Sequence, residues 1–124
     1  MGCMMETNSF AIVILSLLFL FIFLSGYLLS RSGKPFNVLV LTIHKLLSLA
    51  ALIYLSTRVV RVPLNSLKFG LVAAAGIFFV STIITGGLLS TDKNLSTIVH
   101  RFHQIIPYLT VLSAFAVLLV VAGR

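Results

Sequence analysis

Charged residues are scarce in this chain, and acidic residues are almost missing. Only 9% of its 124 residues are charged, and the two acids are Glu6 and Asp92. Soluble domains carry roughly a quarter charged residues, so eleven charged side chains are too few to cover a water-facing surface. Lipid tails, in contrast, accept apolar side chains on the outside of a protein. With 60% hydrophobic residues, the composition predicts an integral membrane protein in a lipid bilayer.

Cysteine is nearly absent too, because Cys3 stands alone. One cysteine excludes an internal disulfide, a multi-cysteine metal cluster and covalent haem attachment through C-x-x-C-H. The shortage of acids counts against a proton-coupled carrier, which usually buries a carboxylate within a span. The net charge of +7 is interpreted as lysine and arginine facing anionic lipid. No soluble basic surface is expected, and therefore no nucleic acid partner.

Four apolar segments are long enough to cross a bilayer, which takes about 20 helical residues. The expected spans are residues 10–30, 36–57, 69–90 and 95–121. Short connections make sequential helices antiparallel neighbours. The predicted fold is all-α: an integral membrane four-helix bundle, up-down-up-down, with two similar helical hairpins in one transmembrane domain over residues 1–124.

A short internal repeat supports the two hairpins. The segment SGYLLS at residues 25–30 resembles TGGLLS at residues 85–90, and each precedes a polar turn and a histidine-bearing span. A shift of 59 residues places His44 on His103, whereas a shift of 56 places it on His100. The sequence leaves both registers open.

All three histidines lie in or at the edge of the spans, where ionisable side chains are costly and usually functional. His44 and His103 each lie eight residues into their spans, roughly 12 Å along parallel helices. Two imidazoles at one depth suit the axial positions of a haem iron. His103 is preferred over His100, which lies roughly 4.5 Å nearer the surface by helical rise. Pro107 also removes the helical donor to the His103 carbonyl and permits a local kink there.

Other residues fit a macrocycle with anionic propionates. Gly26 and Gly86 lie near the same membrane face as the histidines and would leave room for a flat ring. Cations for the propionates are expected at this face from Lys45, Arg101, Arg31, Lys34 and Lys93. A ligating imidazole usually makes a second hydrogen bond. The candidates for that bond are Thr42, Ser48 and Gln104.

The segments IHKLL at residues 43–47 and VHRFHQIIP at residues 99–107 resemble small four-helix b-type cytochromes of bacteria and archaea. This group includes cytochrome b subunits and superoxide-oxidase-like proteins. The resemblance implies one haem b per chain, held by His44 and His103, with His100 the competitor for His103. It also implies electron exchange with quinone. Several relatives hold two haems and need four ligands, whereas three histidines allow one bis-histidine haem here.

The same resemblance implies a prokaryotic cytoplasmic membrane. Loop and tail cations divide four against three between the two faces, which favours both termini on the cytoplasmic side. The sequence leaves open whether the chain is an enzyme, whether it pairs as a homodimer and whether a redox partner protein docks on it.

Three alternatives remain for the histidines. In the first alternative, the histidines form hydrogen bonds across helices that stabilise the bundle, each contributing roughly 0.6–2 kcal/mol. In the second, the chain is a small transporter or channel subunit in which the imidazoles relay protons. In the third, the three histidines bind zinc, although His100 does not lie at the depth of the other two.

Overall fold

The computed structural model describes residues 2–33, 35–63, 65–91 and 97–122, with side chains from Ser9 to Val121 within those ranges. Three features predicted from the sequence lie outside the described residues: Lys34, Lys93 and the start of the fourth span at residue 95.

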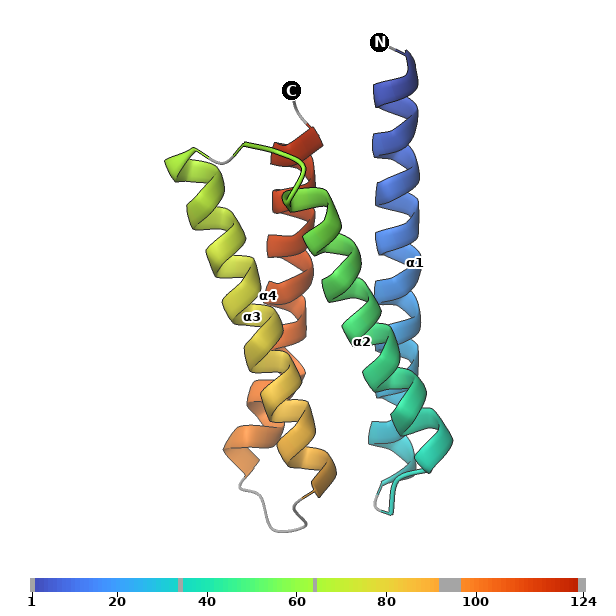
Figure 1. Cartoon of the computed structure of the whole chain (residues 1–124). Helices are drawn as coiled ribbons and strands as arrows, with labels where there is room; N and C mark the ends of the chain where they lie inside the picture. The colour runs from blue at the N-terminus through green and yellow to red at the C-terminus, as the bar shows by residue number, and fades with distance from the viewer. Residues whose placement is uncertain (1, 34, 64, 92–96, 123–124) are drawn as a thin grey trace. The chain divides into compact units, whose positions relative to one another are not determined.

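Four helices make up the described chain: α1 (Gly2–Ser32), α2 (Val38–Val59), α3 (Ser66–Thr91) and α4 (Thr97–Ala122) (Figure 1). The described residues include no strand, which confirms the all-α, four-helix class. Each helix is long and apolar enough to cross a membrane, over Ser9–Ser32, Val38–Val59, Ser66–Thr91 and Thr97–Val121. These lengths reach the roughly 30 Å of hydrocarbon that a helix must span. The chain is therefore an integral membrane protein.

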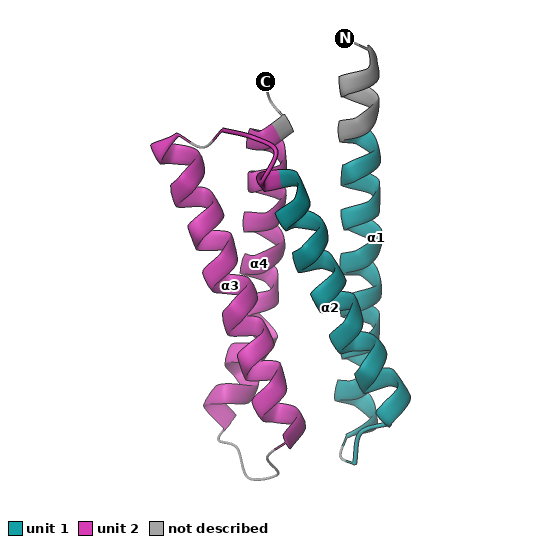
Figure 2. Ribbon diagram, viewed as in Figure 1, with its two compact units in different colours: residues 1–58 teal, residues 59–124 magenta. Residues whose placement is uncertain are grey.

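The helices group into two compact units, Met1–Arg58 and Val59–Arg124 (Figure 2). The first unit is an antiparallel hairpin of α1 and α2, and the second is an antiparallel hairpin of α3 and α4. They are called hairpin 1 and hairpin 2 below. The two similar hairpins predicted from the repeat are both present.

Local sequence signals set the helix boundaries. Gly33 adopts a φ of 66°, which suits glycine, and its N–H donates to the Leu29 carbonyl at 3.3 Å to close the end of α1. The Asn37 side chain starts α2, because its Oδ1 accepts from the Leu39 N–H at 2.9 Å. Asn65 starts α3 in the same way, accepting from the Lys68 N–H at 2.9 Å. The third helix therefore begins three residues before the predicted Phe69.

Candidate functional site: one held histidine in each hairpin

The first candidate ligand, His44, is held inside hairpin 1. Its ring is half-buried on α2, and its Nδ1 lies 2.9 Å from Ser25 Oγ and 3.1 Å from the Ile22 carbonyl oxygen, both on α1. Ser25 lies seven residues before the end of α1, and His44 lies six residues after the start of α2. Because the two helices run antiparallel from one short turn, these counts bring both side chains to one depth.

The second candidate ligand, His103, has the same setting in hairpin 2. Its half-buried ring places Nδ1 2.9 Å from Thr85 Oγ1 on α3. Thr85 lies six residues before the end of α3, and His103 lies six residues after the start of α4. In each hairpin, therefore, a hydroxyl on the first helix contacts Nδ1 of a histidine on the second.

A glycine follows each of these hydroxyl residues, and the imidazole packs against it. A Cβ placed on Gly26 would lie 3.1 Å from Cε1 of His44, and one placed on Gly86 would lie 2.9 Å from Cε1 of His103. At these points the histidine rings themselves lie against the glycines, where room for a macrocycle was predicted. Gly26 and Gly86 thus form part of the surroundings of the two imidazoles. Contact between these glycines and a macrocycle stays a prediction.

These contacts decide the register of the internal repeat. Ser25-Gly26 faces His44 as Thr85-Gly86 faces His103, so the first helices match at a shift of 60 and the histidines at a shift of 59. The buried residues Phe19 and Phe79 are also 60 apart. The alternative shift of 56, which pairs His44 with His100, does not reproduce these contacts.

The third histidine, His100, has a different environment from His103. It is exposed, and its Nε2 accepts from the side-chain amide of Gln104 at 3.1 Å, one turn along the same helix. The structure thus separates the two histidines of α4: one bonds across its hairpin and the other bonds along its own helix.

The three residues predicted to make the second hydrogen bond to a ligating ring each make another hydrogen bond in the structure. The Thr42 hydroxyl donates to the Val38 carbonyl at 2.7 Å, and the Ser48 hydroxyl donates to the backbone carbonyl of His44 at 2.8 Å. Gln104 bonds to His100 instead. The hydroxyls of Thr42 and Ser48 thus bond back to the preceding turn of their own helix, as Ser and Thr inside a helix readily do. A bond from Gln104 to a ligating ring stays a prediction.

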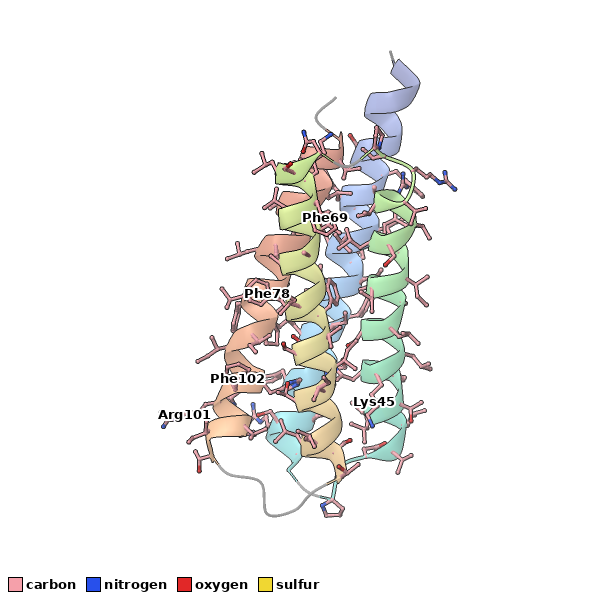
Figure 3. The ribbon with its side chains drawn as sticks, turned by 60° about the vertical axis from the view of Figure 1, so that its left-hand side comes forward. Lys45, Phe69, Phe78, Arg101 and Phe102 are labelled. Carbon is pink, nitrogen blue, oxygen red and sulfur yellow. The ribbon has the colours of Figure 1, made fainter. Side chains whose placement is uncertain are left out.

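The predicted cations are solvent- or lipid-accessible. Lys45 and Arg101 are both exposed, and Figure 3 shows Arg101 projecting from α4 on the side away from α3. Arg31 is also exposed and donates to the Tyr27 hydroxyl at 2.9 Å, four residues back along α1. Their contact with propionates stays a prediction.

Within the described residues, no group of three or more His, Cys, Asp or Glu side chains is arranged to hold a metal ion. A three-histidine zinc site therefore has no support there. What the arrangement does offer is one imidazole from each hairpin. Comparison with protein-family models, with curated proteins and with solved structures finds no match to this chain.

Proposed function

We propose that this chain is a membrane haem b protein that transfers electrons, with His44 and His103 as the axial ligands of one haem. The observation that carries the proposal is the matched setting of the two imidazoles, one in each hairpin, each half-buried against a hydroxyl and a glycine. A polar ring inside a membrane span is costly and usually functional. Because the same arrangement of imidazole, hydroxyl and glycine occurs in both hairpins, the chain would provide two equivalent nitrogen ligands.

The donor set suits this group. Haem b with two axial histidines takes two imidazole nitrogens and needs neither a thiolate nor a carboxylate. When bound, the haem supplies reversible one-electron chemistry. The protein's own part is to present the imidazoles and to surround them with apolar spans that exclude water. The exposed ammonium of Lys45 and guanidinium of Arg101 would neutralise the propionates.

Quinone is the proposed redox partner, because a lipid-soluble carrier reaches a protein that consists almost entirely of membrane spans. We assign the proton exchange that quinone reduction requires to His100, because its imidazole is exposed on α4. Arg101, the next residue, would hold a quinone carbonyl. The proposed location is the cytoplasmic membrane of a prokaryote, with both termini in the cytoplasm.

The test is an absorption spectrum of the detergent-purified protein, oxidised and reduced, after expression with added haem. We expect low-spin haem b bands in the parent and in His100→Ala. His44→Ala and His103→Ala should lose these bands or leave a five-coordinate remnant. Loss of haem in His100→Ala with retention in His103→Ala would reverse the ligand assignment. A parent with no Soret band would refute the proposal.

One observation favours a second candidate, a non-haem membrane protein whose histidines stabilise the hairpins. Both imidazoles already bond a hydroxyl on the neighbouring helix, and such bonds contribute about 0.6 kcal/mol on average in a membrane protein. Under this alternative, His44→Ala and His103→Ala lower the unfolding free energy of a protein that never binds haem.

A further inference from the structure

The Ser25 hydroxyl and the Ile22 carbonyl both lie within hydrogen-bond distance of Nδ1 of His44, and their roles bear on which ring nitrogen carries the proton. A hydroxyl has one proton to donate, and Ser25 Oγ donates it to the Ile22 carbonyl at 2.9 Å. With its proton on that carbonyl, the hydroxyl is left to accept at 2.9 Å from Nδ1, which requires the hydrogen on Nδ1. The Ile22 carbonyl oxygen, 3.1 Å from the same Nδ1, agrees, because a carbonyl only accepts. The opposite tautomer would turn the Nδ1 lone pair towards that oxygen.

Thr85 acts on His103 in the same way. Its hydroxyl donates to the Ser81 carbonyl at 2.8 Å, with the Thr82 carbonyl at 3.1 Å. A hydroxyl whose proton is used within α3 is left to accept from an Nδ1–H across the 2.9 Å contact with His103.

We propose that Ser25 and Thr85 are positioning residues that hold His44 and His103 in the Nδ1–H tautomer, so that Nε2 of each ring is the ligating atom. A neutral imidazole has one N–H, and the other nitrogen carries the lone pair that binds a metal. Gly26 packs against Cε1 of His44, and Gly86 packs against Cε1 of His103. Each contact limits the movement of the imidazole away from its neighbouring hydroxyl. The tautomer assignment stands on these contacts alone, whereas its role in ligating iron rests on the proposed haem function.

The first experiment uses the haem-free protein in detergent micelles at alkaline pH, where imidazole is neutral. Long-range proton–nitrogen NMR of histidine-labelled protein reports which ring nitrogen is protonated. We expect Nδ1–H at both His44 and His103. Thr85→Val should raise the Nε2–H fraction of His103, and Ser25→Ala should raise that of His44.

The matched variants separate the hydroxyl from general packing. Ser25→Thr and Thr85→Ser keep a hydroxyl and should keep the parent tautomers. Ser48→Ala removes a hydroxyl that donates to the His44 backbone carbonyl, and Thr82→Val removes one that bonds the Phe78 carbonyl and Thr110. Both variants should leave the tautomers unchanged. An Nε2–H signal at either histidine in the parent overturns the proposal. An unchanged tautomer ratio in Ser25→Ala overturns the role of Ser25 and assigns it to the Ile22 carbonyl; the same result in Thr85→Val overturns the role of Thr85.

The second experiment uses the haem-loaded protein. A hydrogen bond from Nδ1–H makes a ligating imidazole more basic, and losing such a partner typically weakens metal binding 10- to 100-fold. We expect Thr85→Val and Ser25→Ala to lower haem affinity roughly 10-fold or more and to move the reduction potential to more positive values, with low-spin bands retained at saturating haem. Thr85→Ser, which keeps a hydroxyl, should keep the haem affinity and the reduction potential of the parent. Nδ1–H tautomers in a protein that binds no haem would refute the proposed function alone, whereas low-spin haem with the opposite tautomers would refute this inference alone.

Discussion

The contact between Gly86 and His103 leads to a quantitative prediction for Gly86→Ala. The added methyl group would lie 2.9 Å from Cε1 of His103, and the ring must retreat by about 0.5 Å to restore an ordinary contact of 3.4 Å. That movement also strains the hydrogen bond of 2.9 Å between Nδ1 and Thr85. The next residue, Gly87, provides a matched control, because a Cβ there would meet nothing within 4 Å.

The expected magnitude comes from two opposing effects. Inserting a methyl group into a packed contact costs typically about 1–3 kcal/mol, whereas replacing glycine by alanine in a helix contributes up to about 1 kcal/mol of stability. Gly87→Ala receives only the second effect. Gly86→Ala should therefore be about 1–3 kcal/mol less stable than Gly87→Ala. Gly26→Ala should fall between them, because its closest ring contact is 3.1 Å.

The assay is reversible unfolding in mixed micelles with increasing sodium dodecyl sulfate, followed by far-UV circular dichroism. Gly86→Ala and Gly87→Ala add one methyl group to adjacent residues of the same helix, so effects of the detergent largely cancel in the comparison. Equal unfolding free energies for the two variants would show that the His103 ring does not pack against Gly86. The packing of an imidazole against a glycine would then be refuted for hairpin 2.

Three further predictions concern the whole chain and hairpin 2. Four spans are even in number, so reporter fusions at the two termini should report the same side of the membrane, and opposite sides would end the four-span topology. A pyridine haemochrome assay should give one haem b per chain; two would reveal a ligand beyond the three histidines. Thr82→Val removes the hydrogen bond of 3.1 Å with buried Thr110 across hairpin 2. It should lower the unfolding free energy by about 0.6 kcal/mol, whereas Thr42→Val, whose hydroxyl bonds within its own helix, should have a smaller effect.

The spans, and the position of each histidine along its helix, were predictable from the sequence because both depend on distances along the chain. Runs of apolar residues define the spans, and a rise of 1.5 Å per residue converts position into depth. The preference for His103 over His100 came from this argument, and the structure gives the two residues correspondingly different environments. Their roles as ligand and non-ligand stay predictions.

The hydroxyl partners of the histidines were missed because they come from the other helix of each hairpin. Thr42 and Ser48 lie within about a turn of His44 in the sequence, but their hydroxyls bond to their own helix. The signal was nonetheless present, since Ser25-Gly26 and Thr85-Gly86 occupy equal positions in the repeat. Counting six or seven residues back from each turn would have placed them at the depth of the imidazoles.

The short turn of hairpin 1 also bears on how the chain is made. Asn37 and Gly33 define the turn locally, and Ser25 and His44 lie only 19 residues apart. The first hairpin therefore contains both partners of its own polar contact before the second hairpin has been synthesised. Since an unpaired polar group in lipid is costly, a half-made chain that enters the bilayer as a hairpin avoids exposing His44 alone. Each half of the protein can complete its polar contacts in the order of translation, and membrane insertion does not have to wait for the C-terminal half.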